Sequence, residues 1–224
     1  MSKPMYIDYA SITELDLSYK QLDVLPDLSM YINLKVLTCN FNKLTTLDNL
    51  PDSLKILNCY NNKITSLDNL PHGILELNCC FNKLTTLDNL PASLTELNCV
   101  DNKLTSLDNL PPSLVELYCA NNELTSLDNL PQGLKILHCW RNKLTSLDNL
   151  PQELKILHCY YNKLTSLDNL PSNLKILYCN SNNLTSLDNL PTSLRELSCG
   201  DNPFIYDFVP TLENIRKYNA TRIA

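Results

Sequence analysis

Glycine is scarce in this 224-residue chain, which contains only 3 glycines beside 13 prolines and 10 cysteines. Average proteins contain about 7% glycine, so the turns of this chain must be built largely from other residues. Long apolar runs are also missing, since none approaches the roughly 18–20 residues of a membrane-spanning helix. A transmembrane helix is therefore not expected.

The first residues lack the apolar core of a secretory signal, and Asp8 and Glu14 appear early. We therefore expect no signal peptide and a cytoplasmic location. An excess of positive charge is missing as well, because 18 basic residues stand against 24 acidic ones and the net charge is −6. Such a chain is a poor ligand for nucleic acid or an anionic membrane, so neither is an expected partner.

A period of twenty residues dominates the rest of the sequence. Residues 54–73 read LKILNCYNNKITSLDNLPHG, with the skeleton L-x-x-L-x-C-x-x-N-x-L-x-x-L-x-x-L-P. Ten such repeats can be counted between residues 12 and 204, of which the first is degenerate. Self-similarity of this kind predicts a repeat architecture in which each unit packs on its neighbours.

This skeleton resembles the leucine-rich repeat family, whose pattern is L-x-x-L-x-L-x-x-N/C-x-L, with cysteine here at the third apolar position. The Leu-Pro ending and the short repeat length are similar to repeats of secreted bacterial effectors and of giant-virus proteins. The resemblance implies a leucine-rich repeat solenoid of the α/β-type right-handed superhelix class. It says little about activity, because the matching residues are packing residues.

The residue pattern predicts the same fold independently. Leu57, Asn58 and Cys59 alternate inward and outward as in a strand, and stacked repeats would place these strands in a parallel sheet on the concave face. The short return segments contain Asp, Asn and Pro, which favour extended or polyproline-like turns on the convex face. Asn62 and its equivalents are expected to bind backbone groups where the chain bends inward. The Asp68-Asn69 pair and its equivalents are expected to form Asx turns.

The chain is expected to form a single domain with two irregular ends: residues 1–11 are a lead, residues 12–204 the repeats, and residues 205–224 a cap. A cap is expected because a terminal repeat otherwise exposes apolar side chains and a sheet edge.

The cap is expected to contain a short helix from about Thr211 to Asn219. Thr211 is a plausible N-cap residue, and Leu212, Ile215 and Tyr218 would share one face of the helix.

The cysteines form one inward column, from which only Cys80 departs. Zinc sites use ligands a few residues apart, and parallel Cβ vectors hold neighbouring thiols too far apart for disulfides. We therefore expect reduced, buried thiols that pack as small apolar groups. The Cys-x-Asp sequences at Cys99 and Cys199 are similar to the nucleophile motif of some ubiquitin-ligase effectors, but both cysteines are packing positions.

Other catalytic and metal-binding patterns are weak. His72, His138 and His158 occur in no metalloprotease or nucleophile-elbow context, and two imidazoles without a nearby carboxylate make a weak metal site. The aspartate column at Asp68 and its equivalents is expected to form turns, not a calcium site. Acidic rows oppose the lysine rows that a nucleic-acid groove would need. No enzyme activity, cofactor or metal is expected.

The variable residues lie on the outward face of the strands. On repeats six to nine, aromatic, histidine and arginine side chains gather: Tyr118, His138, Trp140, Arg141, His158, Tyr160, Tyr161 and Tyr178. Trp, Tyr and Arg are enriched in binding hot spots, and four repeats can cover one side of a protein interface. Glu76, Glu96, Glu116 and Asp101 form an acidic stretch beside them.

The sequence thus predicts a monomeric, non-catalytic scaffold that binds a protein partner through its concave surface. If the effector or viral resemblance holds, the partner is a host protein and the location is host cytoplasm. Two alternatives stay open. The aromatic side chains could serve only to stabilise the sheet by cross-strand pairing, or the solenoid could be a structural element that assembles end to end.

Overall fold

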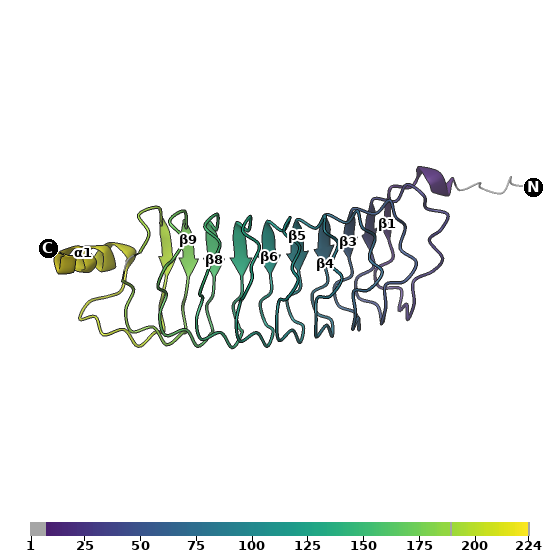
Figure 1. Cartoon of the computed structure of the whole chain (residues 1–224). Helices are drawn as coiled ribbons and strands as arrows, with labels where there is room; N and C mark the ends of the chain where they lie inside the picture. The colour runs from purple at the N-terminus through teal and green to yellow at the C-terminus, as the bar shows by residue number, and fades with distance from the viewer. Residues whose placement is uncertain (1–7, 189, 224) are drawn as a thin grey trace, which may run out of the picture.

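The computed structural model of the chain describes residues 8–188 and 190–223 and shows an elongated solenoid (Figure 1). Ten strands form one parallel sheet in sequence order. Their bounds are Glu14–Asp16 (β1), Val36–Thr38 (β2), Ile56–Asn58 (β3), Glu76–Asn78 (β4), Glu96–Asn98 (β5), Glu116–Tyr118 (β6), Ile136–His138 (β7), Ile156–His158 (β8), Ile176–Tyr178 (β9) and Glu196–Ser198 (β10). The 3-10 helix η1 (Tyr9–Ser11) precedes the sheet, and the helix α1 (Leu212–Ile223) follows it. The predicted solenoid and its parallel sheet are confirmed.

The period fixes the register of the sheet. Leu57 pairs with Leu37 on one side and Leu77 on the other, so equivalent residues of successive repeats lie in columns. Each strand has only three residues, but backbone pairing continues beyond it. The Cys59 N–H donates to the Asn78 carbonyl at 2.8 Å, and the Phe81 N–H donates to the Val100 carbonyl at 2.9 Å.

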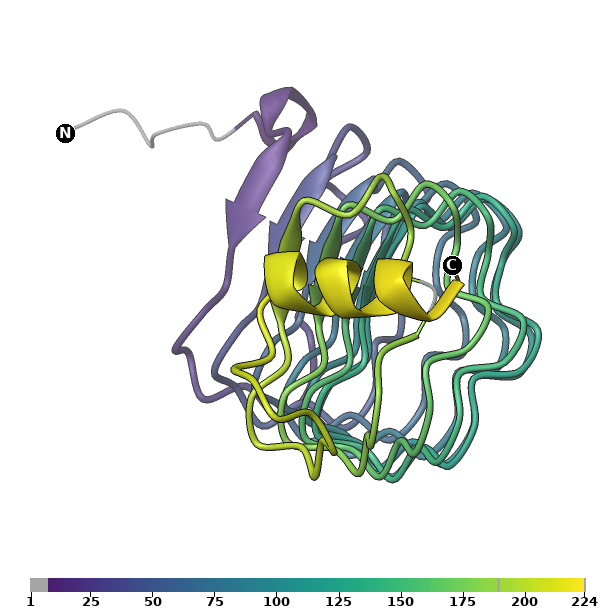
Figure 2. The ribbon, with the colours of Figure 1, turned by 90° about the vertical axis from the view of Figure 1, so that its left-hand side faces the viewer.

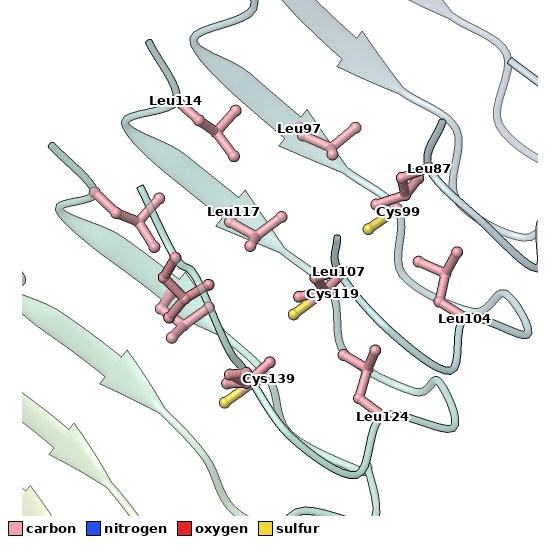
Figure 3. Close-up of a cluster of buried hydrophobic side chains, with 14 of the residues drawn as sticks. Leu87, Leu97, Cys99, Leu104, Leu107, Leu114, Leu117, Cys119, Leu124 and Cys139 are labelled. Atoms are coloured by element: carbon pink, nitrogen blue, oxygen red, sulfur yellow. The ribbon is translucent and has the colours of Figure 1, made fainter. Parts of the chain in front are cut away.

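The core consists of columns of leucine and cysteine. Leu97, Leu117, Cys99 and Cys119 are fully buried, and Figure 3 shows their side chains on the same side of the strands. Burying a leucine side chain contributes about 1.5–3 kcal/mol, but a single repeat has nothing to bury it against. The repeats are therefore stable only as a stack. The cysteines contribute to it as the predicted column of buried, free thiols.

The inward asparagines link adjacent repeats, as the sequence predicts. The Asn82 Nδ2 donates to the carbonyls of Cys59 and Cys79, both at 3.1 Å, while its Oδ1 accepts from the Ile64 N–H at 2.9 Å. The same arrangement recurs at Asn62, Asn122 and Asn142. These side chains replace the backbone partners that the chain loses when it bends after each strand.

Turns and extended segments, without a helix among the described residues, carry the chain back along the convex side. The predicted Asx turns are wrong, because the aspartates accept hydrogen bonds from hydroxyl groups two residues earlier. Thr46 donates to Asp48 at 2.7 Å, and Ser126 donates to Asp128 at 2.7 Å. The turn itself is made by the asparagine that follows each aspartate, which adopts a left-handed conformation, with φ 64° at Asn69.

Helix α1 closes the C-terminal end of the solenoid, across which it lies in Figure 2. Its N-cap is as predicted, since Thr211 Oγ1 accepts from the Asn214 N–H at 3.2 Å, and Ile215 is fully buried. The predicted end at Asn219 is wrong, because the helix continues to Ile223. No glycine or proline follows Asn219 to stop it.

The helices in the described part of the chain are too short or too polar to span a bilayer.

Candidate protein-binding surface

One row of rings runs across the outward face of β6 to β9. Tyr118 contacts His138 edge to face, with ring centroids 4.8 Å apart. His138 stacks on His158 at 4.0 Å, and His158 stacks on Tyr178 at 4.3 Å. Because parallel strands lie about 4.8 Å apart, equivalent outward positions bring rings to stacking distance without any bend in the sheet.

A second row lies beside the first, closer to the turn that follows the strands. Trp140 stacks on Tyr160 with centroids 5.3 Å apart and planes 5° apart, and Tyr161 meets Tyr160 edge-on at 5.7 Å. The Arg141 guanidinium lies 5.8 Å from the Trp140 ring centre and 5.4 Å from that of Tyr161, which are cation–π distances. His158 and Tyr160, 6.4 Å apart, join the rows.

The structure thus brings together all eight residues that the sequence singled out. We call them the aromatic surface: Tyr118, His138, Trp140, Arg141, His158, Tyr160, Tyr161 and Tyr178. Most are half-buried against one another, whereas Arg141 and Tyr161 are exposed. The surface is therefore partly pre-ordered and still accessible to a partner.

An apolar row that was not among the predicted site residues lies on the same face. Ile136, Ile156 and Ile176 are half-buried on the outward side of β7 to β9, next to the lysine column that begins with Lys135. Alignment of the repeats reveals this row, because β4 to β6 carry glutamate at the same position. The aromatic surface is thus bordered by apolar residues on one side.

The two histidines of the first row are uncharged at neutral pH. Burial, reinforced by the neighbouring His158, lowers the pKa of His138 to about 4. Burial also lowers the pKa of His158. Neutral imidazoles can stack closely without repulsion, which agrees with the short distance between the two rings. In the described part of the chain, no group of three or more His, Cys, Asp or Glu side chains could hold a metal ion.

The acidic stretch adjoins the aromatic surface at Tyr118. The Tyr118 hydroxyl donates to Glu116 at 2.7 Å, and burial together with this contact raises the pKa of Tyr118. Burial, and then the charges of Glu116 and Glu76, raises the pKa of Glu96. The sheet face therefore changes from acidic on β4 to β6 to aromatic and apolar on β7 to β9.

Two positions in each of repeats two to eight adopt left-handed backbone conformations. On the convex side this position is asparagine throughout: Asn49, Asn69, Asn89, Asn109, Asn129, Asn149 and Asn169. At the edge where the chain leaves the strands, the residues vary: Tyr19, Phe41, Asn61, Phe81, Asp101, Asn121, Arg141, Tyr161, Ser181 and Asp201, with φ between 51° and 58°.

The conformational strain at this edge position depends on the residue type. Asparagine and aspartate tolerate the left-handed region, whereas a bulky side chain is strained there by about 1–2 kcal/mol. Arg141 and Tyr161 of the aromatic surface occupy such positions, with φ 51° and 53°. Asparagine at Asn61 and Asn121 adopts the same backbone conformation, so the fold does not require the larger side chains at this position.

The cysteines are poor nucleophiles in this environment. Burial raises the pKa of Cys99 well above its usual value and that of Cys199 to about 11, so both remain thiols at neutral pH. The Cys199 thiol donates to the Pro210 carbonyl at 3.2 Å. Cys80 departs from the column but is also buried, 2.6 Å from the Asn98 Oδ1. The Cys-x-Asp sequences thus lack an activated thiolate.

The fold and the repeat skeleton define a class, the leucine-rich repeat solenoids, and comparisons agree. A family model described as "Leucine Rich repeats (2 copies)" matches residues 112–152. Together with the ten-stranded solenoid and the similar structures below, it places the chain in the leucine-rich repeat family. Curated protein sequences gave no significant match.

Solved structures of bacterial proteins are similar over most of the chain. A functional domain of InlJ from Listeria monocytogenes, described as including a cysteine ladder, is 36% identical with a TM-score of 0.79, over 93% of this chain and 48% of that one. YopM from Yersinia enterocolitica is 30% identical with a TM-score of 0.72, over 88% and 48%. A Shigella effector domain is 26% identical with a TM-score of 0.58, over 95% and 77%. The chain spans about half the length of the first two.

Proposed function

We propose that this protein is a non-catalytic scaffold that binds a protein partner through the aromatic surface. The observation that supports it most is the continuous stack of rings on β6 to β9, bordered by the exposed Arg141 and Tyr161. Stacked rings have already lost much of their rotamer freedom, so binding would order few additional side chains. Trp140 and Tyr160 are the anchors that we expect to matter most.

The location, the kind of partner and the oligomeric state are also proposed. Ten free, buried cysteines suit a reducing compartment, which supports a cytoplasmic location. Similar structures are described as bacterial effectors, which supports a host protein as the partner. The protein is proposed to act as a monomer, because α1 lies across the end of the solenoid after the last repeat. Arg216 of α1 donates to the Leu194 carbonyl at 2.9 Å.

Affinity capture from host-cell lysate tests this function. The native chain is compared with a Trp140→Ala/Tyr160→Ala/Tyr161→Ala variant and with a matched Asn58→Ala/Asn78→Ala variant of the same sheet face. Circular dichroism establishes that all three chains fold. We expect the native chain and the asparagine variant to recover the same partner and the aromatic variant to lose it. Recovery of the same partner by all three would show that the aromatic surface is not the binding site.

A further inference from the structure

A second cluster of rings lies at the other end of the solenoid, along the edge where the chain leaves β1 to β4. Tyr19 stacks on Phe41 with centroids 4.4 Å apart and planes 11° apart. Tyr60 meets Phe41 edge to face at 5.0 Å and Phe81 at 5.2 Å. Tyr19 is 69% exposed, Phe81 46% and Phe41 36%, so this cluster is largely open to solvent.

The strained backbone conformation of these aromatic residues argues against a purely structural role. Tyr19, Phe41 and Phe81 have φ of 58°, 52° and 53°, in the left-handed region that bulky side chains disfavour. Asn61 adopts φ 54° at the same position between Phe41 and Phe81, so asparagine fits this edge. Strained residues that the fold does not require are candidates for a functional contact.

Two rows of residues follow this edge in repeats one to four, the left-handed residues and the residues two positions later. We call the strip that they form the edge groove: Tyr19, Phe41, Asn61 and Phe81 in one row, Gln21, Lys43, Lys63 and Lys83 in the other. The buried asparagine between the two rows, such as Asn42, forms the floor. At its start, Tyr19, Gln21, Phe41, Asn42 and Lys43 enclose a hollow of about 410 Å³.

The charge of the edge groove is opposite to that of the protein. Its two rows contain three lysines and no carboxylate, although the net charge is −6. Ion pairs between described side chains involve only Lys143 with Glu123 and Lys217 with Glu213, so Lys43, Lys63 and Lys83 keep their charge available. Equivalent lysines of successive repeats lie about 4.8 Å apart along the groove.

The charge of this edge changes where the next hollow begins. That hollow, of about 510 Å³, includes Asn61 and Phe81 of the edge groove but is also lined by Asp101, Lys103 and Glu123. A ligand that matches the edge groove is therefore short and negatively charged, and it offers an apolar group to the exposed rings.

We propose that the edge groove docks an acidic peptide segment that places carboxylates on the lysine row and an aliphatic or aromatic side chain against Phe41 and Phe81. A peptide fits better than a nucleic-acid strand. Tyr19 and Phe41 each cover one face of the other ring, which leaves fewer open faces for bases to stack on. The carboxylates of the next hollow would also repel a continuing phosphate chain. This docking is separate from the aromatic surface.

Selection from a random peptide library displayed on phage tests the proposal. The native full-length chain is the bait, and enriched peptides are measured by fluorescence anisotropy. We expect sequences rich in Asp and Glu around one large apolar residue. Phe41→Asn/Phe81→Asn and Lys43→Gln/Lys63→Gln/Lys83→Gln should each weaken binding by at least about tenfold, and the lysine variant should lose most of the salt dependence.

The controls separate loss of the groove from loss of folding. Asparagine already occupies the left-handed position at Asn61, so Phe41→Asn/Phe81→Asn should keep a native thermal unfolding midpoint. Ser181→Asn makes an equivalent change outside both surfaces and should leave peptide affinity unchanged. Failure to enrich any peptide, enrichment without acidic residues, or binding by either groove variant as tight as that of the native chain would overturn the proposal. So would groove-dependent binding of a labelled single-stranded oligonucleotide, which would indicate a nucleic-acid ligand instead.

Discussion

Asparagine stabilises this fold in two distinct ways. On the convex side it supplies the left-handed turn, as at Asn69, where few other side chains are unstrained. Inside the solenoid it supplies hydrogen bonds that the bent backbone lacks, as at Asn82. Together with proline, these residues explain how the chain turns so often with 3 glycines.

Replacing an inward asparagine should be much more harmful than replacing an exposed one. Asn82→Ala removes the donor to two buried carbonyls and the acceptor for a buried N–H, and each unsatisfied buried group costs about 1–3 kcal/mol. We expect a loss of about 2–3 kcal/mol in the free energy of unfolding by urea, followed by circular dichroism. Asn183→Ala, at an exposed side chain, should change it by less than about 0.5 kcal/mol. Equal effects of the two variants would refute the structural role of the asparagine column.

The stacked histidines should make stability depend on pH. The pKa of His138 is lowered from 6.5 to about 4 in the folded chain, so protonation favours the unfolded state. The stabilising effect of the neutral ring is complete above pH 6.5 and is lost as the pH falls toward 4. Since carboxylates titrate in the same range, the measurement is the difference between the native chain and His138→Asn in urea midpoint. The native chain should lose more stability over this range, and parallel curves would contradict the lowered pKa.

The role of the inward asparagines could be predicted from the sequence, because their column follows directly from the period. They did not predict the hydrogen bonds of the aspartates, because hydroxyl groups two residues earlier compete for the carboxylates. The strained conformation of Phe41 and Phe81 was also hidden, since an aromatic residue carries no signal for the left-handed region. The edge groove was therefore missed.

Side-chain hydrogen bonds attach α1 to the last repeats. Its Arg216 donates to the carbonyls of Pro191, Thr192 and Leu194, and the Pro191 carbonyl also accepts from the Leu194 N–H. Its N-terminus was predictable from Thr211, whereas its end was not, because the sequence there contains neither a glycine nor a proline as a stop signal.

Loss of the Arg216 contacts should loosen the last repeat first. Arg216→Ala leaves three carbonyls without a charged donor, so amide hydrogen exchange in β10 should become faster while that in β5 remains unchanged. Lys217→Ala, which removes only an exposed ion pair with Glu213, should leave both strands protected. Faster exchange in β5 or unchanged exchange in β10 would show that the cap does not act locally.

For the entire molecule, the period determines both register and shape, since every repeat places the same residue opposite the same neighbour. The solenoid and the location of the eight aromatic-surface residues could therefore be derived from the sequence. The isoleucine row could also have been derived by aligning the repeats. The edge groove could not, because it depends on the left-handed backbone of Phe41 and Phe81.

A capped, acidic solenoid should remain monomeric. With α1 across the end of the solenoid and a net charge of −6, end-to-end stacking is opposed by the helix and by repulsion. Light scattering over a wide concentration range should give a constant mass of 25.5 kDa. A mass that grows with concentration would favour the assembly alternative.

Binding through the aromatic surface is tested most directly by the affinity of the captured partner for single-residue variants. Trp140 and Asn58 both lie on the outward side of the sheet, but only Trp140 belongs to the aromatic surface. Isothermal titration should show that Trp140→Ala weakens binding by about 30-fold or more, the effect of a hot-spot residue worth at least about 2 kcal/mol. Asn58→Ala should change the affinity by less than about threefold. If both variants bind the partner as tightly as the native chain, the aromatic surface is not the binding site.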